Sequence, residues 1–292
     1  MSMDAEATPD DPILRADLLA GWRLHAPRLL ADTHSSRLYR VRRADGNSAV
    51  LKQLKPEGLG ERAGFAYLAW RDGLGSVRLL ERTEDACLLE DAGTQSLADL
   101  HKAEGDEAAT PILCQLLPLL HARSDRPPPS DLIPLERHFR SLFQLAQKEG
   151  PHREMANWAA MQVRDLLDRQ TRKIPLHGDL HHDNVMKDTH GTWRIIDPQG
   201  LIGDPAYEVA NIFGNPGGAH LFEPARVVRL AEAFAPVLDC DPLKVLRYAG
   251  AHAMLSTAWS LNEPHNAHAA ENIRERLAVA GFIRSLIEQQ SV

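Results

Sequence analysis

Alternation of apolar and polar positions marks the first third of the chain as a region of short strands. After a short amphipathic helix at Ile13–Trp22 come three strand-like runs, and Asp45-Gly46-Asn47 between the last two is typical of a hairpin turn. A helical stretch and two more strand-like runs follow. The predicted strands are Ala26–Asp32, Arg37–Arg43, Ser48–Leu54, Val77–Thr83 and Ala86–Glu90, with a helix at Gly60–Trp70 between the third and the fourth.

The pattern changes after Asp91–Gly93, where apolar positions begin to recur at helical spacing and continue to the end of the chain. One short strand-like island, residues 174–196, interrupts the helices, and its loops are rich in histidine and aspartate. We therefore predict an α+β protein with two lobes. The N-terminal lobe, residues 1–92, starts with a disordered tail and is rich in strands, and the larger lobe, residues 93–292, is mainly helical. A cleft between two such lobes is a common place for a ligand.

Composition narrows the class of protein. The 292 residues are 43% hydrophobic and 25% charged, which is ordinary for a globular chain and excludes overall disorder. The net charge of −7 argues against a nucleic-acid partner and favours cationic ones. No apolar run is long enough for a membrane span, and the acidic N-terminus does not resemble a signal peptide. Cys87, Cys114 and Cys240 form neither a zinc pair nor a disulfide framework, so we expect a cytoplasmic protein.

The segment from His177 to Asn184 is the richest in chemistry, because it holds three histidines, two aspartates and an asparagine in eight positions. Buried polar groups each need a hydrogen-bond partner, so such a run makes a poor core and a good site. Asp197 follows an apolar strand 13 positions after Asn184, and a strand-turn-strand return would bring the two side chains together. Amide and carboxylate oxygens suit Mg²⁺ better than zinc.

Lys52 lies inside an apolar strand, where a buried charge is costly unless it is paired with an opposite charge. Phosphate oxygens and a carboxylate from the following helix would pair with this charge, with Glu61 as the expected partner and Glu57 as the weaker candidate. Together these residues predict a phosphoryl-transfer site. Lys52 would hold nucleotide phosphates, Asn184 and Asp197 would hold Mg²⁺, and Asp179 would accept the proton from the attacking hydroxyl or orient that hydroxyl.

The spacing His177-x-Asp179-x-x-x-x-Asn184, followed by Ile196-Asp197, resembles the catalytic and metal loops of the aminoglycoside phosphotransferase family, relatives of protein kinases. The segments LHGDLHHDNV and IIDPQGLIGDPAYEVANIFGNP more closely resemble the corresponding segments of one branch of this family, the aminoglycoside/hydroxyurea antibiotic resistance kinases. That branch contains streptomycin 6-phosphotransferases. The resemblance implies a bilobal protein-kinase-like fold, ATP, Mg²⁺ and a small hydroxyl-bearing acceptor. It also implies that adenine bonds to the chain near the residues Glu90, Asp91 and Gly93.

Two positions depart from this pattern. The loop from Asp32 to Ser36 contains no glycine, so phosphate contacts there are expected from Ser35, Ser36 and backbone N–H groups. Asp183 stands before Asn184, where a small residue is expected, and its extra carboxylate is expected to perturb metal affinity.

The acceptor is expected to be a cationic amino-sugar, streptomycin first, phosphorylated at its 6-hydroxyl. Candidate acceptor contacts are His182, Asp183, Trp259 and Glu263. Carboxylates pair well with guanidinium groups, which supports a cationic ligand.

Other interpretations stay open. A kinase of another small metabolite would share all these motifs, because one fold hosts many functions. A metallohydrolase would use His177, Asp179, His181 and His182 as ligands, but their order matches no zinc spacing and leaves Lys52 unexplained. A kinase fold without activity, serving as a binding module, is a third possibility. Asp204 is expected to cap a helix at 206–213, and Glu208 is expected to be structural.

Overall fold

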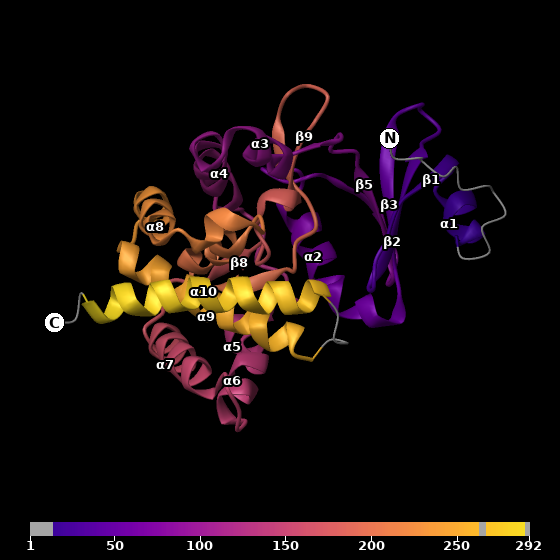
Figure 1. Ribbon diagram of the computed structural model, residues 1–292. Helices are drawn as coiled ribbons and strands as arrows, with labels where there is room; N and C mark the ends of the chain where they lie inside the picture. The colour runs from indigo at the N-terminus through magenta and orange to yellow at the C-terminus, as the bar shows by residue number, and fades with distance from the viewer. Residues whose placement is uncertain (1–13, 263–266, 290–292) are drawn as a thin grey trace.

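The computed structural model describes residues 14–262 and 267–289 and has a strand-rich lobe beside a larger helical lobe (Figure 1). The strand-rich lobe is built on a five-stranded sheet in which all neighbouring strands are antiparallel. In their order across the sheet, the strands are β1 (His25–Asp32), β2 (Ser36–Arg42), β3 (Ser48–Leu54), β5 (Ala86–Glu90) and β4 (Leu79–Arg82). The five predicted strands and the hairpin between β2 and β3 are therefore confirmed.

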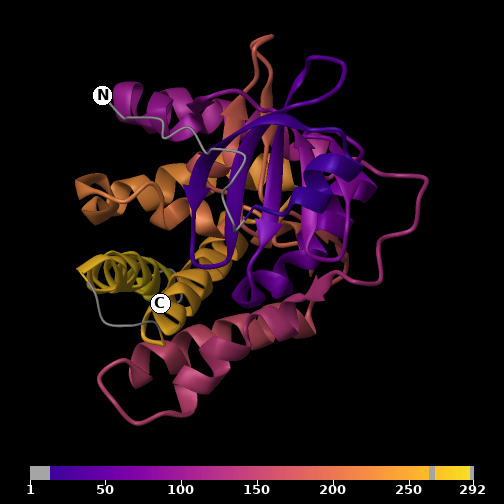
Figure 2. The same ribbon diagram turned by 90° about the vertical axis from the view of Figure 1, so that its right-hand side faces the viewer.

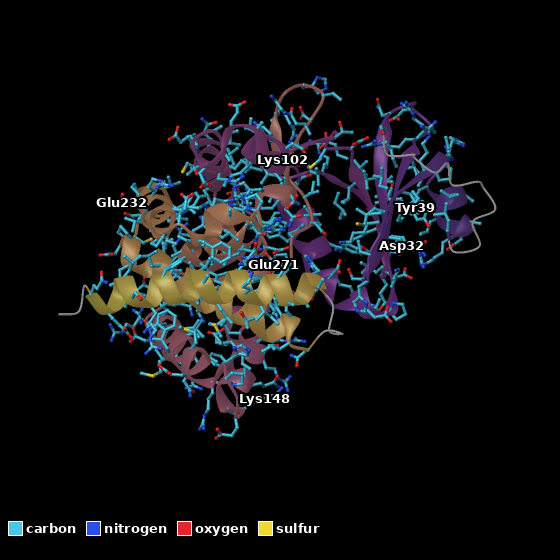
Figure 3. All side chains as sticks on the ribbon, in the orientation of Figure 1. Asp32, Tyr39, Lys102, Lys148, Glu232 and Glu271 are labelled. Carbon is cyan, nitrogen blue, oxygen red and sulfur yellow. The ribbon has the colours of Figure 1, made fainter. Side chains whose placement is uncertain are left out.

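The two faces of this sheet have different neighbours. The outer face buries Tyr39 and packs against the short helix α1 (Ala16–Gly21), which lies in front of the sheet in Figure 2, and Figure 3 labels the tyrosine. Directly opposed residues on neighbouring strands share a face, so Lys52 of β3 lies beside Leu38 of β2 on the other side. Because Lys52 contacts Asp197, this second face is turned toward the helical lobe.

The segment after β3 lies between the sheet and the helical lobe (Figure 1). It consists of a 3₁₀ helix, η1 (Pro56–Glu61), and the helix α2 (Arg62–Arg71), so the predicted helix begins two residues later than expected. A Cβ atom on Gly64 of α2 would lie 2.0 Å from the carbonyl oxygen of Pro198. Glycine at this position therefore allows the helix to approach the backbone that follows Asp197.

The helical lobe surrounds α9, whose residues are buried on nearly all sides and which packs against α6, α7, α8 and α10. The helices of this lobe are α3 (Leu97–Glu104), α4 (Asp106–Leu120), α5 (Leu135–His138), α6 (Arg140–Gln147), α7 (Arg153–Asp168), α8 (Pro224–Leu238), α9 (Pro242–Ser260) and α10 (Ala267–Gln289). The helix predicted at 206–213 is instead a pair of 3₁₀ turns, η3 (Pro205–Tyr207) and η4 (Ala210–Gly214), and a third turn follows at η5 (Ala219–Phe222). Asp204 does cap η3, because its Oδ1 accepts from the amide of Ala206 at 3.0 Å.

Two small sheets carry the strand-like island. One contains β10 (Trp193–Ile195), β9 (Val185–Lys187) and β6 (Gln95–Ser96), and the other contains β7 (Ile133–Pro134), β11 (Leu201–Gly203) and β8 (Ile174–Leu176). The sequence pattern did not predict β11. The loop between β8 and β9 and the segment between β10 and β11 are therefore held at both ends by strands.

Within residues 14–262 and 267–289, none of the helices is both long and apolar enough to span a bilayer.

Candidate active site

The buried carboxylate of Glu208 holds the start of the loop between β8 and β9 by hydrogen bonds to its backbone. Its two oxygens accept from the backbone amides of His177 at 3.1 Å and Gly178 at 2.9 Å, and His121 Nε2 donates to it at 3.2 Å. Burial opposes ionisation of Glu208, but these donors outweigh it and lower the pKa of the carboxyl. Gly178 has a φ of +80°, and a Cβ there would lie 2.3 Å from the side chain of Leu201. The local chain path thus depends on a glycine and on one buried charge, which fits the expected structural role of Glu208.

His177 joins this loop to the segment that carries Asp197. The imidazole is fully buried, accepts from the amide of Asp179 at Nδ1 (3.2 Å) and donates from Nε2 to the carbonyl of Ile196 (2.7 Å). Burial lowers the pKa of His177, so the ring stays neutral with its proton on Nε2. His177 therefore positions two loops relative to each other.

Asp179 is held by two side-chain amides. Asn211 Nδ2 donates to Oδ1 at 2.8 Å, and Asn184 Nδ2 donates to Oδ2 at 3.1 Å and to the backbone oxygen of Asp179 at 2.9 Å. About 29% of the Asp179 side chain remains exposed, enough for a ligand to reach it. Burial opposes its ionisation, but the nearby His181 outweighs burial and the pKa of Asp179 is lowered. The carboxylate is thus fixed, charged and open to a hydroxyl group.

Asn211 was not among the predicted site residues. It lies in η4, and Asn215 Nδ2 donates to its Oδ1 at 2.7 Å, which orients the amide so that its NH₂ group faces Asp179. The only signal in the sequence was a polar residue between the apolar Val209, Ala210 and Ile212.

His181 lies between two carboxylates. Its Nε2 is 3.7 Å from Asp179 Oδ2 and its Nδ1 is 3.5 Å from Asp183 Oδ2. Burial opposes protonation, but the two acids outweigh it and raise the pKa of His181 to about 9. The side chain of Asp183 is 64% exposed, so the carboxylate that departs from the family pattern faces His181 and solvent.

Lys52 pairs with one acid of its own lobe, Glu61, and with one acid of the helical lobe, Asp197. Its buried ammonium lies 2.6 Å from Glu61 Oε2 and also contacts Asp197 Oδ1. Burial alone would lower its pKa, but Asp197 and Glu61 outweigh burial and raise it, so the lysine is charged. Glu61, and not Glu57, is thus the acid that pairs with Lys52.

Asn184 and Asp197 lie on neighbouring segments, because the amide of Ile196 donates to the backbone oxygen of Asn184 at 2.9 Å. The Asn184 NH₂ group is used by Asp179, which leaves Oδ1 as its acceptor. Asp197 adopts a φ of +56° and is half exposed, with its carboxylate turned to the cation of Lys52. The donor set of one carboxylate and one amide oxygen, already facing a positive charge, fits a divalent cation such as Mg²⁺.

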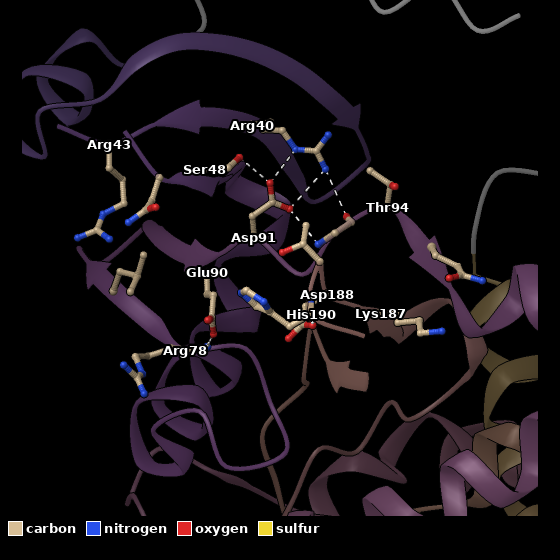
Figure 4. A pocket seen from close by; sticks show the side chains of 15 residues that line it. Arg40, Arg43, Ser48, Arg78, Glu90, Asp91, Thr94, Lys187, Asp188 and His190 are labelled. Atoms are coloured by element: carbon tan, nitrogen blue, oxygen red, sulfur yellow. Dashed lines mark hydrogen bonds and ion pairs between the residues drawn. The ribbon is translucent and has the colours of Figure 1, made fainter. Parts of the chain in front are cut away.

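The connection between the lobes is held by a second cluster, shown in Figure 4. Asp91 accepts from Arg40 Nε at 2.9 Å, from Ser48 Oγ at 2.6 Å and from the amide of Gly93 at 3.0 Å. These side chains line a cavity of about 780 Å³. The amide of Glu90 likewise donates to Arg78 O at 2.9 Å. The amides of Glu90 and Gly93 are therefore already engaged within the protein, and adenine binding at this connection stays a prediction.

The turn between β1 and β2 places its two serines differently. Ser36 is buried, and its amide and carbonyl oxygen both bond to Thr33 Oγ1 at 3.0 Å. Ser35 is partly exposed, and its carbonyl accepts from the amide of Lys55 at 2.8 Å. The turn itself covers the Ser36 side chain, which does not favour a phosphate contact from its hydroxyl. Ser35 stays a candidate.

The predicted acceptor contacts do not all face the same space. His182 is fully buried with its ring 5.0 Å from that of His101, which does not favour the predicted contact with the acceptor. Trp259 is partly exposed and packs edge-on against the rings of His138 and His252. Glu263 lies outside the described residues.

The positions of these histidines do not favour a metallohydrolase that uses His177, Asp179, His181 and His182 as its ligands. His177 uses both ring nitrogens within the protein, and His182 points away from Asp179. In the described part of the chain, these residues and His181 form no common cluster of ligand atoms.

Comparison with known proteins agrees with this geometry. Residues 21–263 match the family model for aminoglycoside/hydroxyurea antibiotic resistance kinases. The chain is 37% identical to the streptomycin 3''-kinase of Klebsiella pneumoniae over 83% of this chain and 90% of that protein. It is 32% identical to the streptomycin 6-kinase of Streptomyces griseus over 68% of this chain and 65% of that protein.

The fold is similar to that of solved kinases. A thermostable mutant of the aminoglycoside phosphotransferase APH(4)-Ia gives a TM-score of 0.63 at 16% identity, covering 93% of this chain and 99% of that one. Choline kinase LicA from Streptococcus pneumoniae gives 0.64 at 13% identity, covering 92% and 96%. The bilobal kinase-like fold is thus confirmed, and the chain is a small-molecule phosphotransferase that belongs to the aminoglycoside/hydroxyurea antibiotic resistance kinase family.

Proposed function

We propose that this kinase transfers the γ-phosphate of ATP to a hydroxyl group of streptomycin, with Mg²⁺ as the divalent cation. The observation that carries the proposal is the meeting of Asp179, Asn184, Asp197 and Lys52 where the two lobes touch, in a chain whose relatives include streptomycin kinases. A cytoplasmic location stays a prediction.

Each residue has a role that follows from its contacts. Asp179 accepts a hydrogen bond from the acceptor hydroxyl and takes its proton as the hydroxyl oxygen bonds to the γ-phosphorus and the bond from that phosphorus to ADP breaks, with ADP as the leaving group. Its amide partners leave the carboxylate charged and open for this role. Lys52 turns its ammonium from Asp197 to the nucleotide phosphates while Glu61 keeps hold of it. Mg²⁺, when bound, neutralises phosphate charge, and Asn184 Oδ1 and the Asp197 carboxylate are the groups that would hold it.

The choice of hydroxyl has two candidates. The sequence led us to expect the 6-hydroxyl, and two relatives at 31–32% identity are named streptomycin 6-kinases. The relative at 37% identity is named a 3''-kinase. Streptomycin is therefore proposed as the acceptor, and the two hydroxyls are arms of the test.

Support for a cationic acceptor comes from one acid next to Asp179. Asp183 is exposed and four residues further along the loop, where a guanidinium group would find a carboxylate. Glu271 of α10, labelled in Figure 3, is already paired with Arg274 and is a weaker candidate.

The test is coupled ADP release with streptomycin, followed by mass spectrometry of the product. We expect one added phosphate per molecule, and fragmentation locates it on the 3''- or the 6-hydroxyl. Asp179→Asn serves as the enzyme control. Hydroxyurea is the second acceptor to assay, because a hydroxyurea phosphotransferase of Kitasatospora aureofaciens is 32% identical over 66% of this chain. Turnover with hydroxyurea and none with streptomycin would refute the proposed acceptor and leave the kinase chemistry standing.

A further inference from the structure

Behind the catalytic loop, on the side away from Asp179, three histidines and one aspartate meet. His101 comes from α3, Asp106 from the start of α4, His182 from η2 and His220 from η5. One ligand atom each from His101, Asp106 and His182 lies within 4.8 Å of the others. The His220 ring centre lies 4.8 Å from that of His101. Three separate elements thus bring nitrogen and oxygen ligands to one point, and the ring of His220 lies beside that of His101.

Several nitrogens of this cluster have no hydrogen-bond partner among the described residues. They are both ring nitrogens of the fully buried His182, Nε2 of His101 and Nε2 of His220. A buried polar atom without a partner is costly, and native proteins keep few of them. These atoms belong to three neighbouring histidines, and each neutral imidazole has one nitrogen lone pair to give, which indicates a missing partner that accepts electron pairs from nitrogen.

We propose that this cluster binds one divalent transition-metal ion of the zinc type through His101, Asp106 and His182, with His220 as the fourth ligand. His101 Nε2 lies 3.3 Å from Asp106 Oδ1. Adjacent ligands of a tetrahedral zinc site are separated by about 3.3 Å, given metal–ligand bonds of about 2.0–2.1 Å. Imidazole with one carboxylate is a donor set that suits zinc and its neighbours in the first transition row.

The surroundings support binding by neutral imidazoles. The His101 side chain is only 9% exposed, and no hydrogen-bond partner among the described residues occupies Nε2 of His101 or Nε2 of His220. Arg226 donates from Nε to Asp106 Oδ2 at 2.7 Å and from Nη2 to Oδ1 at 3.0 Å. These two hydrogen bonds fix the orientation of the carboxylate that would bind the metal. The charge of Arg226 opposes a dication, so the affinity is expected to be lower than that of an all-histidine site.

This site is separate from the one proposed for Mg²⁺. His182 precedes Asn184 by two residues, but its ring faces His101 while the Asn184 amide faces Asp179. A metal here would connect η2 to α3 and α4 and would hold the catalytic loop from behind.

The experiment uses the full-length protein, freed of metal by a chelator and then titrated with Co²⁺ in the presence of excess Mg²⁺. We expect one tightly bound Co²⁺ per chain, with the visible absorption of four-coordinate Co²⁺. We also expect a higher melting temperature for the Co²⁺-bound protein than for the metal-free protein. His101→Asn and His220→Asn should each weaken Co²⁺ binding at least about tenfold and reduce the shift in melting temperature. The matched control is His25→Asn, on an exposed histidine of β1, and Asp197→Ala tests for binding in the cleft.

Two results would overturn the proposal. One is a wild-type protein that binds no Co²⁺ under these conditions, which needs no variant to interpret. The other is unchanged affinity and spectrum in the partly exposed variant His220→Asn and in His101→Asn, with loss in Asp197→Ala instead. Circular dichroism of each metal-free variant establishes that it is folded before titration.

Discussion

At the scale of single residues, the site depends on how amides hold carboxylates. Asp179 accepts from Asn211 and Asn184, and Asn184 thereby keeps its oxygen free. An aspartate-to-asparagine change preserves size and removes charge. At Asp179 it also gives up one of the two hydrogen bonds, because an amide has only one oxygen to accept from Asn211 or Asn184.

Asp179→Asn should fold, bind Mg·ATP as the wild type does and lose about 10²- to 10⁴-fold in turnover, because the acceptor hydroxyl loses its proton acceptor. Steady-state kinetics at saturating acceptor measure the loss, and calorimetry checks nucleotide binding. Asp131→Asn, on an exposed surface aspartate, is the control and should behave as wild type. Turnover within tenfold of wild type would exclude Asp179 from the chemistry.

Asp197→Ala should weaken Mg·ATP binding more than Asn184→Ala does. A carboxylate brings a full charge to the cation and an amide only a dipole. The first change also removes one of the two acids beside Lys52. Calorimetric titration of both variants with Mg·ATP gives the order of affinities, and unchanged binding in both would contradict the proposed metal ligands.

At the scale of elements, the sequence predicted the strands of the N-terminal lobe and the loops of the site, because these depend on local alternation and on turn residues. It did not predict β11, which has three residues and exists through pairing with β7 and β8. The 3₁₀ turns η3 and η4, found where a helix was predicted, also depend on contacts with distant parts of the chain. Asn211 of η4 bonds to Asp179, and Glu208, between the two turns, bonds to the backbone of His177 and Gly178. The burial of His182 was equally hidden, since its neighbours come from α3 and η5.

Gly64→Ala tests the contact between α2 and the backbone after Asp197. The added methyl group would lie 2.0 Å from Pro198 O, so α2 must shift and carry Glu61 away from Lys52. We expect a loss of about 1–3 kcal/mol in the free energy of unfolding and a lower turnover. Gly60→Ala is the matched control, because a Cβ there has no atom within 4 Å. Equal stability and activity of the two variants would show that this contact does not position the site.

At the scale of the whole molecule, buried neutral histidines couple folding to pH. His138 bonds to the hydroxyl of Tyr207 at 2.5 Å, and this hydroxyl in turn bonds to His252 at 2.8 Å. The negative charge of Asp179 favours the protonated form of His138, but burial has the larger effect. Burial lowers the pKa of His138 to about 4, against about 6.5 in the unfolded chain. The unfolded chain therefore binds more protons between these values, so stability is full above pH 6.5 and falls as the pH drops toward 4.

His138→Gln should therefore make the unfolding free energy less dependent on pH between about 4 and 6.5. The expected difference in slope is close to one proton, or about 1.4 kcal/mol per pH unit. Urea unfolding at pH 7.5, 6 and 5 measures it, and His25→Gln on the exposed surface should match the wild type. Identical slopes for His138→Gln and wild type would contradict the lowered pKa.

The contacts between the lobes also determine how the cleft can open. Gly93 approaches Lys187 so closely that a Cβ would lie 2.3 Å from its carbonyl oxygen, and Val77 and Gly75 bond to the backbone of Ile195 at 3.0 Å. These contacts adjoin β5 and β4, which form one side of the sheet order β1-β2-β3-β5-β4. A swing of the sheet would thus use the β4–β5 edge as its axis, and β1 with its turn to β2 would travel furthest.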